Sequence, residues 1–325
     1  MVSVAACGVG KYTADYQMSK DRRMRITWPP YQMTKNLATE GLDYERQCGE
    51  DAYTILPIVE ELEQEGQQPP THQIKFTSPT KAEGLILGVA DGVGGWADMG
   101  VDPGIVSHAM LHLMSVFTKA PQVLSAFRTN MSTNTESNNS SSIIQTLRDV
   151  IAASHDYLQQ TSEEYPDQGL VGSTTVCLAG LDLSAQAPLL HGLNIGDSGF
   201  VVVNRQGIAF EMKTFTHGEA PGQLAVVPEK YRSPGLCMDH ADDAVTEVIP
   251  LNHNDIVVMG SDGLFDNIPS QDIAKCVNTA LSQPVPAAKQ MSYVAFQLMK
   301  LAQQGPKLDD ITVICAQLRF KTPPQ

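Results

Sequence analysis

Short apolar runs rich in valine and isoleucine alternate with turn residues through the second half of the chain. Runs of this length between turn residues are typical of buried strands. They lie at 173–183, 188–196, 199–213, 244–260 and 310–320. The turns at 197–198, 205–207 and 252–254 are too short for the crossovers that parallel strands need, so we expect antiparallel pairing.

Longer segments with apolar residues at helical spacing surround these strands. They span 104–127, 143–161, 270–282 and 287–304. Sheets must bury their apolar faces, and helices beside the strand blocks provide the cover. The pattern predicts an α+β fold, an antiparallel β-sandwich with helices outside.

Three segments interrupt this periodicity. Residues 1–45 show no clean period, and we expect them to be an N-terminal segment leading into a single domain at 46–320. Residues 128–142, "RTNMSTNTESNNSSS", are almost free of apolar groups and predict a flexible surface insertion. Residues 216–244 carry three prolines and three glycines, and we interpret them as a flap beside a functional site.

Charge and cysteine content narrow the function classes. Asp and Glu number 36 against 22 Lys and Arg, a net charge of −14 that disfavours nucleic-acid binding. No apolar stretch reaches the roughly 18 residues that a membrane span needs. The six cysteines show no C-x-x-C pair, which is typical of buried thiols in a reducing compartment.

Acidic residues recur at the ends of the apolar runs. A single Asp there is usually a turn former, but five acidic sites placed alike, two of them adjacent pairs, are harder to explain as turns. Crowded carboxylates repel, and bound cations offset the repulsion. Oxygen ligands without clustered His or Cys favour magnesium or manganese. The acids are Asp91, Asp197 and Asp262 after apolar runs, and Glu50–Asp51 and Asp309–Asp310 before them.

The stretch "DGVGGW" after one run adds glycines and a tryptophan to Asp91. Gly92, Gly94 and Gly95 let the backbone approach an ion or a phosphate closely, although a tight turn is the simpler alternative. The stretch contains neither a P-loop nor a dinucleotide-binding fingerprint. We interpret Trp96 as a packing anchor.

Other candidate side chains favour structural roles. Ser173 and Ser261 lie outside any G-x-S-x-G motif. His108 and His112 are four apart on a predicted helix, but Ala109 stands where H-E-x-x-H has its glutamate.

Six motifs in order give a resemblance to a known family. They are "RQCGEDA" (46–52), "VADGVGG" (89–95), "GSTTV" (172–176), "NIGDSG" (194–199), "GSDGLFD" (260–266) and "LDDITV" (308–313). The chain resembles the metal-dependent Ser/Thr protein phosphatases of type 2C. It is most similar to the branch that contains the mitochondrial members, to which "VAACGVGK" (4–11) is also similar.

The resemblance implies a four-layer αββα fold and a centre of two Mn²⁺ or Mg²⁺ ions. It implies that Arg46 binds the substrate phosphate and that Asp91 is catalytic as a ligand of both ions. The remaining implied roles are ligands at Asp51, Asp262 and Asp309, a carbonyl ligand at Gly92, a metal-bound water held by Glu50, and a third, weaker ion at Asp197 and Asp266.

Two positions depart from the family pattern. Val93 stands where most members have the histidine proposed as general acid, and Asp310 stands where the common form has asparagine. An acid at 310 can still orient water or a ligand. If Val93 marks a missing acid, Val93→His should gain most on substrates with poor leaving groups.

The resemblance implies hydrolysis of phosphoserine and phosphothreonine in proteins by a metal-bridging hydroxide, without a phosphoenzyme. The alternative is a pseudophosphatase that binds phosphoproteins or partners without turnover. A two-metal nuclease is disfavoured by the acidic charge and the Arg46 motif. We expect a monomer with a phosphoprotein substrate, no nucleic acid and no membrane span, in an intracellular location: mitochondrial by resemblance, or else cytoplasmic.

Overall fold

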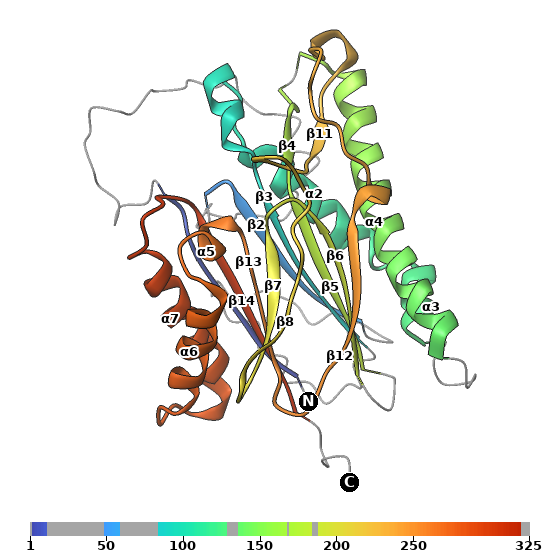
Figure 1. Ribbon diagram of the computed structural model, residues 1–325. Coiled ribbons are helices and arrows are strands. Elements are labelled where there is room, and N and C mark those ends of the chain that lie inside the picture. Colours follow the sequence, from blue (N-terminus) through green and yellow to red (C-terminus); the bar gives the residue numbers. More distant parts are fainter. Residues whose placement is uncertain are drawn as a thin grey trace, which may run out of the picture.

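Two five-stranded antiparallel sheets face each other at the centre of the molecule (Figure 1). The computed structural model describes residues 2–11, 49–58, 84–128, 136–167, 169–183 and 188–319 of the 325. The first sheet runs in the order β1 (Val2–Val9), β14 (Ile311–Leu318), β13 (Ile256–Gly260), β7 (Gly199–Asn204) and β8 (Gly207–Glu211). The second runs β12 (Val245–Pro250), β6 (Leu189–Ile195), β5 (Val176–Asp182), β3 (Gly84–Asp91) and β2 (Asp51–Ile58).

Helices cover the outer face of each sheet (Figure 1). On the first sheet lie α6 (Ser270–Leu281) and α7 (Gln290–Ala302), preceded by the short η7 (Ala287–Lys289). On the second lie α2 (Gly104–Phe117), α3 (Pro121–Arg128) and α4 (Glu136–Glu164). The predicted four-layer αββα sandwich is confirmed. None of the helices in the described ranges combines the length and apolar character that crossing a bilayer requires.

The middle apolar layer explains why the strands appear in the sequence as continuous apolar runs. Every residue of β5 and β13 is buried, because one face of each strand packs on the opposite sheet and the other on helices. Phe200, Val202 and Met259 of the first sheet pack between the sheets with Leu87 and Val89 of the second. Each such side chain contributes about 1.5–3 kcal/mol when fully buried.

Two of the three short turns pass between the sheets instead of closing hairpins. The turn at 197–198 leads from β6 in one sheet to β7 in the other, and the turn at 252–254 leads from β12 to β13. Only the turn at 205–206 joins hydrogen-bonded neighbours, β7 and β8. Asp197 therefore lies where the chain crosses between sheets, at the end that carries the other predicted acids.

The expected domain start at residue 46 is wrong, because the first strand of the sandwich, β1, lies before it. β1 pairs antiparallel with β14 along its whole length, from Val2 opposite Leu318 to Val9 opposite Ile311. Its small residues at an edge position, "VSVAACGV", are mostly half-buried and lack the alternation that marks a strand in sequence. Residues 12–48, including Arg46, lie outside the described residues.

The predicted insertion at 128–142 is shorter than expected, because α4 already begins at Glu136. Serine and asparagine are unfavourable in helix interiors but acceptable near helix N-termini, so this polar stretch extends a helix whose packed part follows it. Residues 129–135 lie outside the described ranges.

The segment 216–244 has regular pieces despite its prolines and glycines. Strand β9 (Thr216–His217) pairs with β10 (Ala220–Pro221), and β11 (Leu224–Val226) pairs with β4 (Gly172–Thr174). Two short helices follow, η5 (Glu229–Tyr231) and η6 (Ala241–Asp243). His155 Nε2 of α4 lies 2.8 Å from the Ala225 carbonyl, so the segment packs against α4 (Figure 1).

Candidate active site

Acids from both sheets converge at one end of the sandwich. Asp51 begins β2 and Asp91 ends β3, and the strand register places the two directly opposite each other. Asp262 begins the short helix α5 (Asp262–Phe265) immediately after β13 of the other sheet. Burial raises the pKa of Asp91 well above its usual range, and the nearby carboxylates of Asp51 and Asp262 raise it further.

The carboxylates of this cluster are incompletely satisfied. Asp51 is fully buried, and its Oδ2 accepts a 2.6 Å hydrogen bond from Ser261 Oγ. Neither Asp51 Oδ1 nor Asp262 Oδ1 accepts a hydrogen bond from any residue in the described ranges, although both atoms are buried. Burial, reinforced by the charge of Asp310, raises the pKa of Asp51. Unpartnered buried oxygens in an all-oxygen donor set fit a hard divalent cation such as Mg²⁺ or Mn²⁺.

Two lysines flank the acids, and no sequence motif predicts either of them. Lys11, just after β1, lies with its Nζ 2.9 Å from Glu50 Oε2 and 3.2 Å from Asp309 Oδ1. Burial lowers the pKa of Lys11, but the carboxylates around it raise the pKa by more, so the amine stays charged. Because these partners are far apart in the chain, no local motif links them.

Lys307 has the corresponding place on the other side. Its Nζ bonds the carboxylates of Asp262 and Asp266 and lies 3.3 Å from Asp309 Oδ2. Asp197, in the turn between the sheets, belongs to the same side. Burial, followed by the charge of Asp262, raises the pKa of Asp197 to about 6. The structure thus places Asp197, Asp262 and Asp266 close together.

The three glycines of the "DGVGGW" stretch differ in how much space a side chain would have at each position. A Cβ on Gly92 would overlap the carbonyl oxygen of Pro103, so only glycine fits, and the Gly92 amide lies 3.3 Å from the Glu50 carbonyl. A Cβ on Gly94 would come 3.4 Å from Glu50 Oε2. A Cβ on Gly95 would meet nothing within 4 Å. The nearby Pro103 carbonyl therefore explains why residue 92 is a glycine, whereas no neighbouring atom requires a glycine at residue 95.

Asp310 has a structural role in addition to its charge. Its carboxylate accepts hydrogen bonds from the backbone amides of Lys11 and Glu50, the latter at 2.9 Å. Gly49 has a φ of +67° and faces the same carboxylate, so a side chain there would collide with it. Asp310 therefore holds the chain that leads into β2, and with it Glu50 and Asp51.

Val93 and Trp96 belong to a small apolar cluster, with Ala225 and Val227 beside them. Trp96 is 9% exposed, and its Nε1 donates a 2.6 Å hydrogen bond to Ser173 Oγ. The expectation that Trp96 is a packing anchor is confirmed. Val93 contributes a packed methyl surface here and has no titratable group for a leaving group.

The remaining candidates have structural partners. Ser261 Oγ bonds Asp51 and accepts from the Thr312 amide at 3.2 Å, so it orients a candidate ligand. His108 Nε2 lies 3.3 Å from the Gly49 carbonyl. Within the described ranges, neither His108 nor His112 belongs to a group of side chains that could hold a metal ion.

Comparisons with known proteins now identify the family. The model of the family described as Stage II sporulation protein E (SpoIIE) matches residues 118–319. A Drosophila mojavensis protein named "Protein phosphatase PTC7 homolog fig" is 31% identical over 267 residues, covering 75% of this chain and 76% of that protein. The chain belongs to the type 2C protein phosphatases. A Danio rerio "Protein phosphatase PTC7 homolog" is 30% identical over 250 residues, 70% of this chain and 75% of that protein.

Solved structures of type 2C phosphatases share the fold. The photosystem II phosphatase PBCP matches with a TM-score of 0.56 and 20% identity, over 98% of this chain and 99% of that one. The catalytic domain of the serine/threonine phosphatase PstP, a structure with two manganese ions, matches with a TM-score of 0.51 and 16% identity over the same shares. By family, the chain is a protein phosphatase.

Proposed function

We propose that this phosphatase hydrolyses phosphoserine and phosphothreonine in proteins in a metal-dependent reaction without a phosphoenzyme. One observation carries the proposal: Asp51 Oδ1 and Asp262 Oδ1 are buried without a hydrogen-bond donor among the described residues, at the point where acids of both sheets converge. A cation is the group that would satisfy them, because desolvated carboxylates otherwise repel and neutralise.

The proposed ligands are oxygen atoms only. Two Mn²⁺ or Mg²⁺ ions would be held by Asp51, Asp91, Asp262 and Asp309, with the Gly92 carbonyl as a further ligand. Glu50 would hold a metal-bound water, and Asp197 with Asp266 would hold a third, weaker ion. When bound, paired divalent cations lower the pKa of water and so supply a nucleophile at neutral pH.

The chain's own side chains do the remaining work. Arg46, by resemblance, binds the phosphate through its planar guanidinium. Lys11 and Lys307 offset the negative charge of the acids, so the cluster can stay ionised while a phosphate, itself an anion, approaches. Ser261 and Asp310 hold Asp51 and the chain before it in place.

A pseudophosphatase is the competing proposal, suggested by the missing histidine at Val93. The presence in the sequence of every acidic residue that the resemblance implies as a metal ligand argues against it. Phosphoprotein substrates follow from the family, whereas a monomeric state and a mitochondrial location remain expectations from the sequence.

The test is hydrolysis of a phosphothreonine peptide by the full chain with and without Mn²⁺. We expect metal-dependent turnover that Asp91→Asn lowers at least about 100-fold, in line with the loss of one group that stabilises charge in the transition state. Asp98→Asn is the matched control, because Asp98 is an exposed acid of the same loop. Equal background rates for wild type and Asp91→Asn would overturn the proposal and favour the pseudophosphatase.

A further inference from the structure

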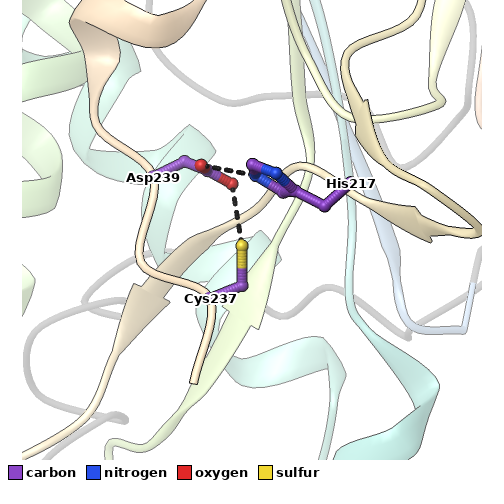
Figure 2. Close-up of side chains that lie close together, drawn as sticks. All are labelled: His217, Cys237 and Asp239. Carbon is purple, nitrogen blue, oxygen red and sulfur yellow. Dashed lines mark hydrogen bonds and ion pairs between the residues drawn. The ribbon is translucent and has the colours of Figure 1, made fainter. Parts of the chain in front are cut away.

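A second set of ligand-type side chains lies in the segment 216–244, which the phosphatase proposal does not use. Figure 2 shows His217 of β9 facing Asp239, with Cys237 beside the same carboxylate. His217 Nε2 lies 2.8 Å from Asp239 Oδ1, and Cys237 Sγ lies 3.4 Å from Asp239 Oδ2. One donor atom from each residue lies within 4.8 Å of the other two.

The donor set differs in kind from the acid cluster. Imidazole nitrogen, thiolate sulfur and carboxylate oxygen are the ligands of zinc, which binds them at about 2.0–2.3 Å in tetrahedral geometry. Such distances put neighbouring ligand atoms about 3.3–3.7 Å apart, close to the separations here. We propose that His217, Cys237 and Asp239 form a zinc site, with the fourth position open to water.

The exposure of the three side chains suits a cation that enters the site from solvent. The Asp239 side chain is 8% exposed and the His217 side chain 46%, so a buried anchor meets an accessible ligand. Zinc binding would release the thiol proton of Cys237 to solvent as the Zn–S bond forms.

The site would join two parts of the segment that are 20 residues apart. Gln223 donates its backbone amide to Asp239 Oδ2 at 2.8 Å and accepts at its carbonyl from the Asp239 amide at 3.2 Å. Ser173 Oγ donates to Gln223 Oε1, and Trp96 Nε1 donates to the same Ser173 Oγ. A bound ion would thus brace the β9–β10 hairpin against residues 237–239, in hydrogen-bond contact with the "DGVGGW" loop.

Cobalt(II) substitution tests the site in the full chain, because thiolate ligation gives a charge-transfer band that oxygen ligands do not. We titrate Co²⁺ in the presence of saturating Mg²⁺ and expect the band to saturate at one equivalent and to be displaced by Zn²⁺. Cys237→Ser should abolish the band. His217→Ala, at an exposed position, should weaken Co²⁺ affinity by at least about tenfold, since loss of outer-sphere partners alone costs that much.

Matched controls separate this site from others. Cys276→Ser, at another half-buried cysteine, and His112→Ala should leave the band unchanged. Asp91→Asn should also keep it, which makes the result independent of the proposed function. The proposal is overturned if wild type shows no band, if Cys237→Ser keeps it, or if correctly folded Asp91→Asn loses it. Far-UV circular dichroism checks that each variant is folded.

Discussion

Ser261→Ala is the sharpest test of how the acid cluster is held. Ser261 is fully buried; its hydroxyl donates to Asp51 Oδ2 at 2.6 Å and accepts from the Thr312 amide at 3.2 Å. Removing the hydroxyl deletes two hydrogen bonds that contribute about 0.5–1.5 kcal/mol each, so we expect the metal-free protein to lose about 1–3 kcal/mol of unfolding free energy. Because Asp51 loses its positioning partner, Mn²⁺ affinity should also fall about 10–100-fold.

Denaturant unfolding in EDTA measures the first effect and calorimetric Mn²⁺ titration the second. Ser154→Ala is the matched control, because Ser154 is equally buried but bonds the Val150 carbonyl within α4. That carbonyl also accepts the ordinary helical hydrogen bond, so the control should lose less than about 1 kcal/mol and bind Mn²⁺ normally. Equal losses for both variants with unchanged Mn²⁺ affinity would refute the positioning role of Ser261.

Three further substitutions test the surroundings. Val93→His replaces a packed methyl surface by an imidazole, so we expect the free energy of unfolding in urea to fall by about 1–2 kcal/mol. We expect no preferential gain in the hydrolysis rate of substrates with poor leaving groups. A rate gain confined to phosphopeptides, and absent with aryl phosphates, would contradict this. Gly92→Ala should lower phosphopeptide turnover more than tenfold, because the added Cβ would overlap the Pro103 carbonyl. Gly95→Ala should retain turnover, because a Cβ there meets open space. Equal activities of the two variants would show that the contact between Gly92 and Pro103 does not matter. Lys307→Met removes a partly exposed cation that competes with Mn²⁺ for the carboxylates, so it should lower the Mn²⁺ concentration for half-maximal activity about two- to fivefold. Lys275→Met, at an exposed lysine, should leave that concentration unchanged. Equal Mn²⁺ requirements for the two variants would show that Lys307 does not compete with Mn²⁺.

The sandwich could be predicted from sequence because buried strands have a local signature. A strand such as β13 is apolar at every position and is followed two residues later by Asp262, so both the element and the acid are visible in one stretch. The same holds for β3 and Asp91. Repetition of this pattern, more than any single motif, predicts that the acids at the strand ends bind cations.

What escaped prediction depends on contacts between distant parts of the chain. β1 is an edge strand of small residues, and its partner β14 follows about 300 residues later, so no local pattern marks it. Lys11 comes directly after β1 and reaches Asp309 only because of that pairing. The turns at 197–198 and 252–254 have the length of hairpin turns, and length alone does not distinguish a hairpin from a crossing between sheets.

The cluster in the flap was missed for a similar reason. His217 and Asp239 are 22 positions apart in a segment without strong periodicity, and Cys237 is one of six cysteines that form no C-x-x-C pair. The pairing of the short strands β9 and β10 and the hydrogen bonds of Gln223 bring His217, Cys237 and Asp239 together. Composition predicts neither the strand pairing nor these hydrogen bonds.

The most direct test of the account is an anomalous difference map from crystals of the full chain grown with Mn²⁺. We predict two strong peaks among the carboxylates of Asp51, Asp91, Asp262 and Asp309, with the Nζ atoms of Lys11 and Lys307 on either side. A map with no manganese among these four carboxylates, at Mn²⁺ concentrations that support phosphopeptide hydrolysis, would contradict the account.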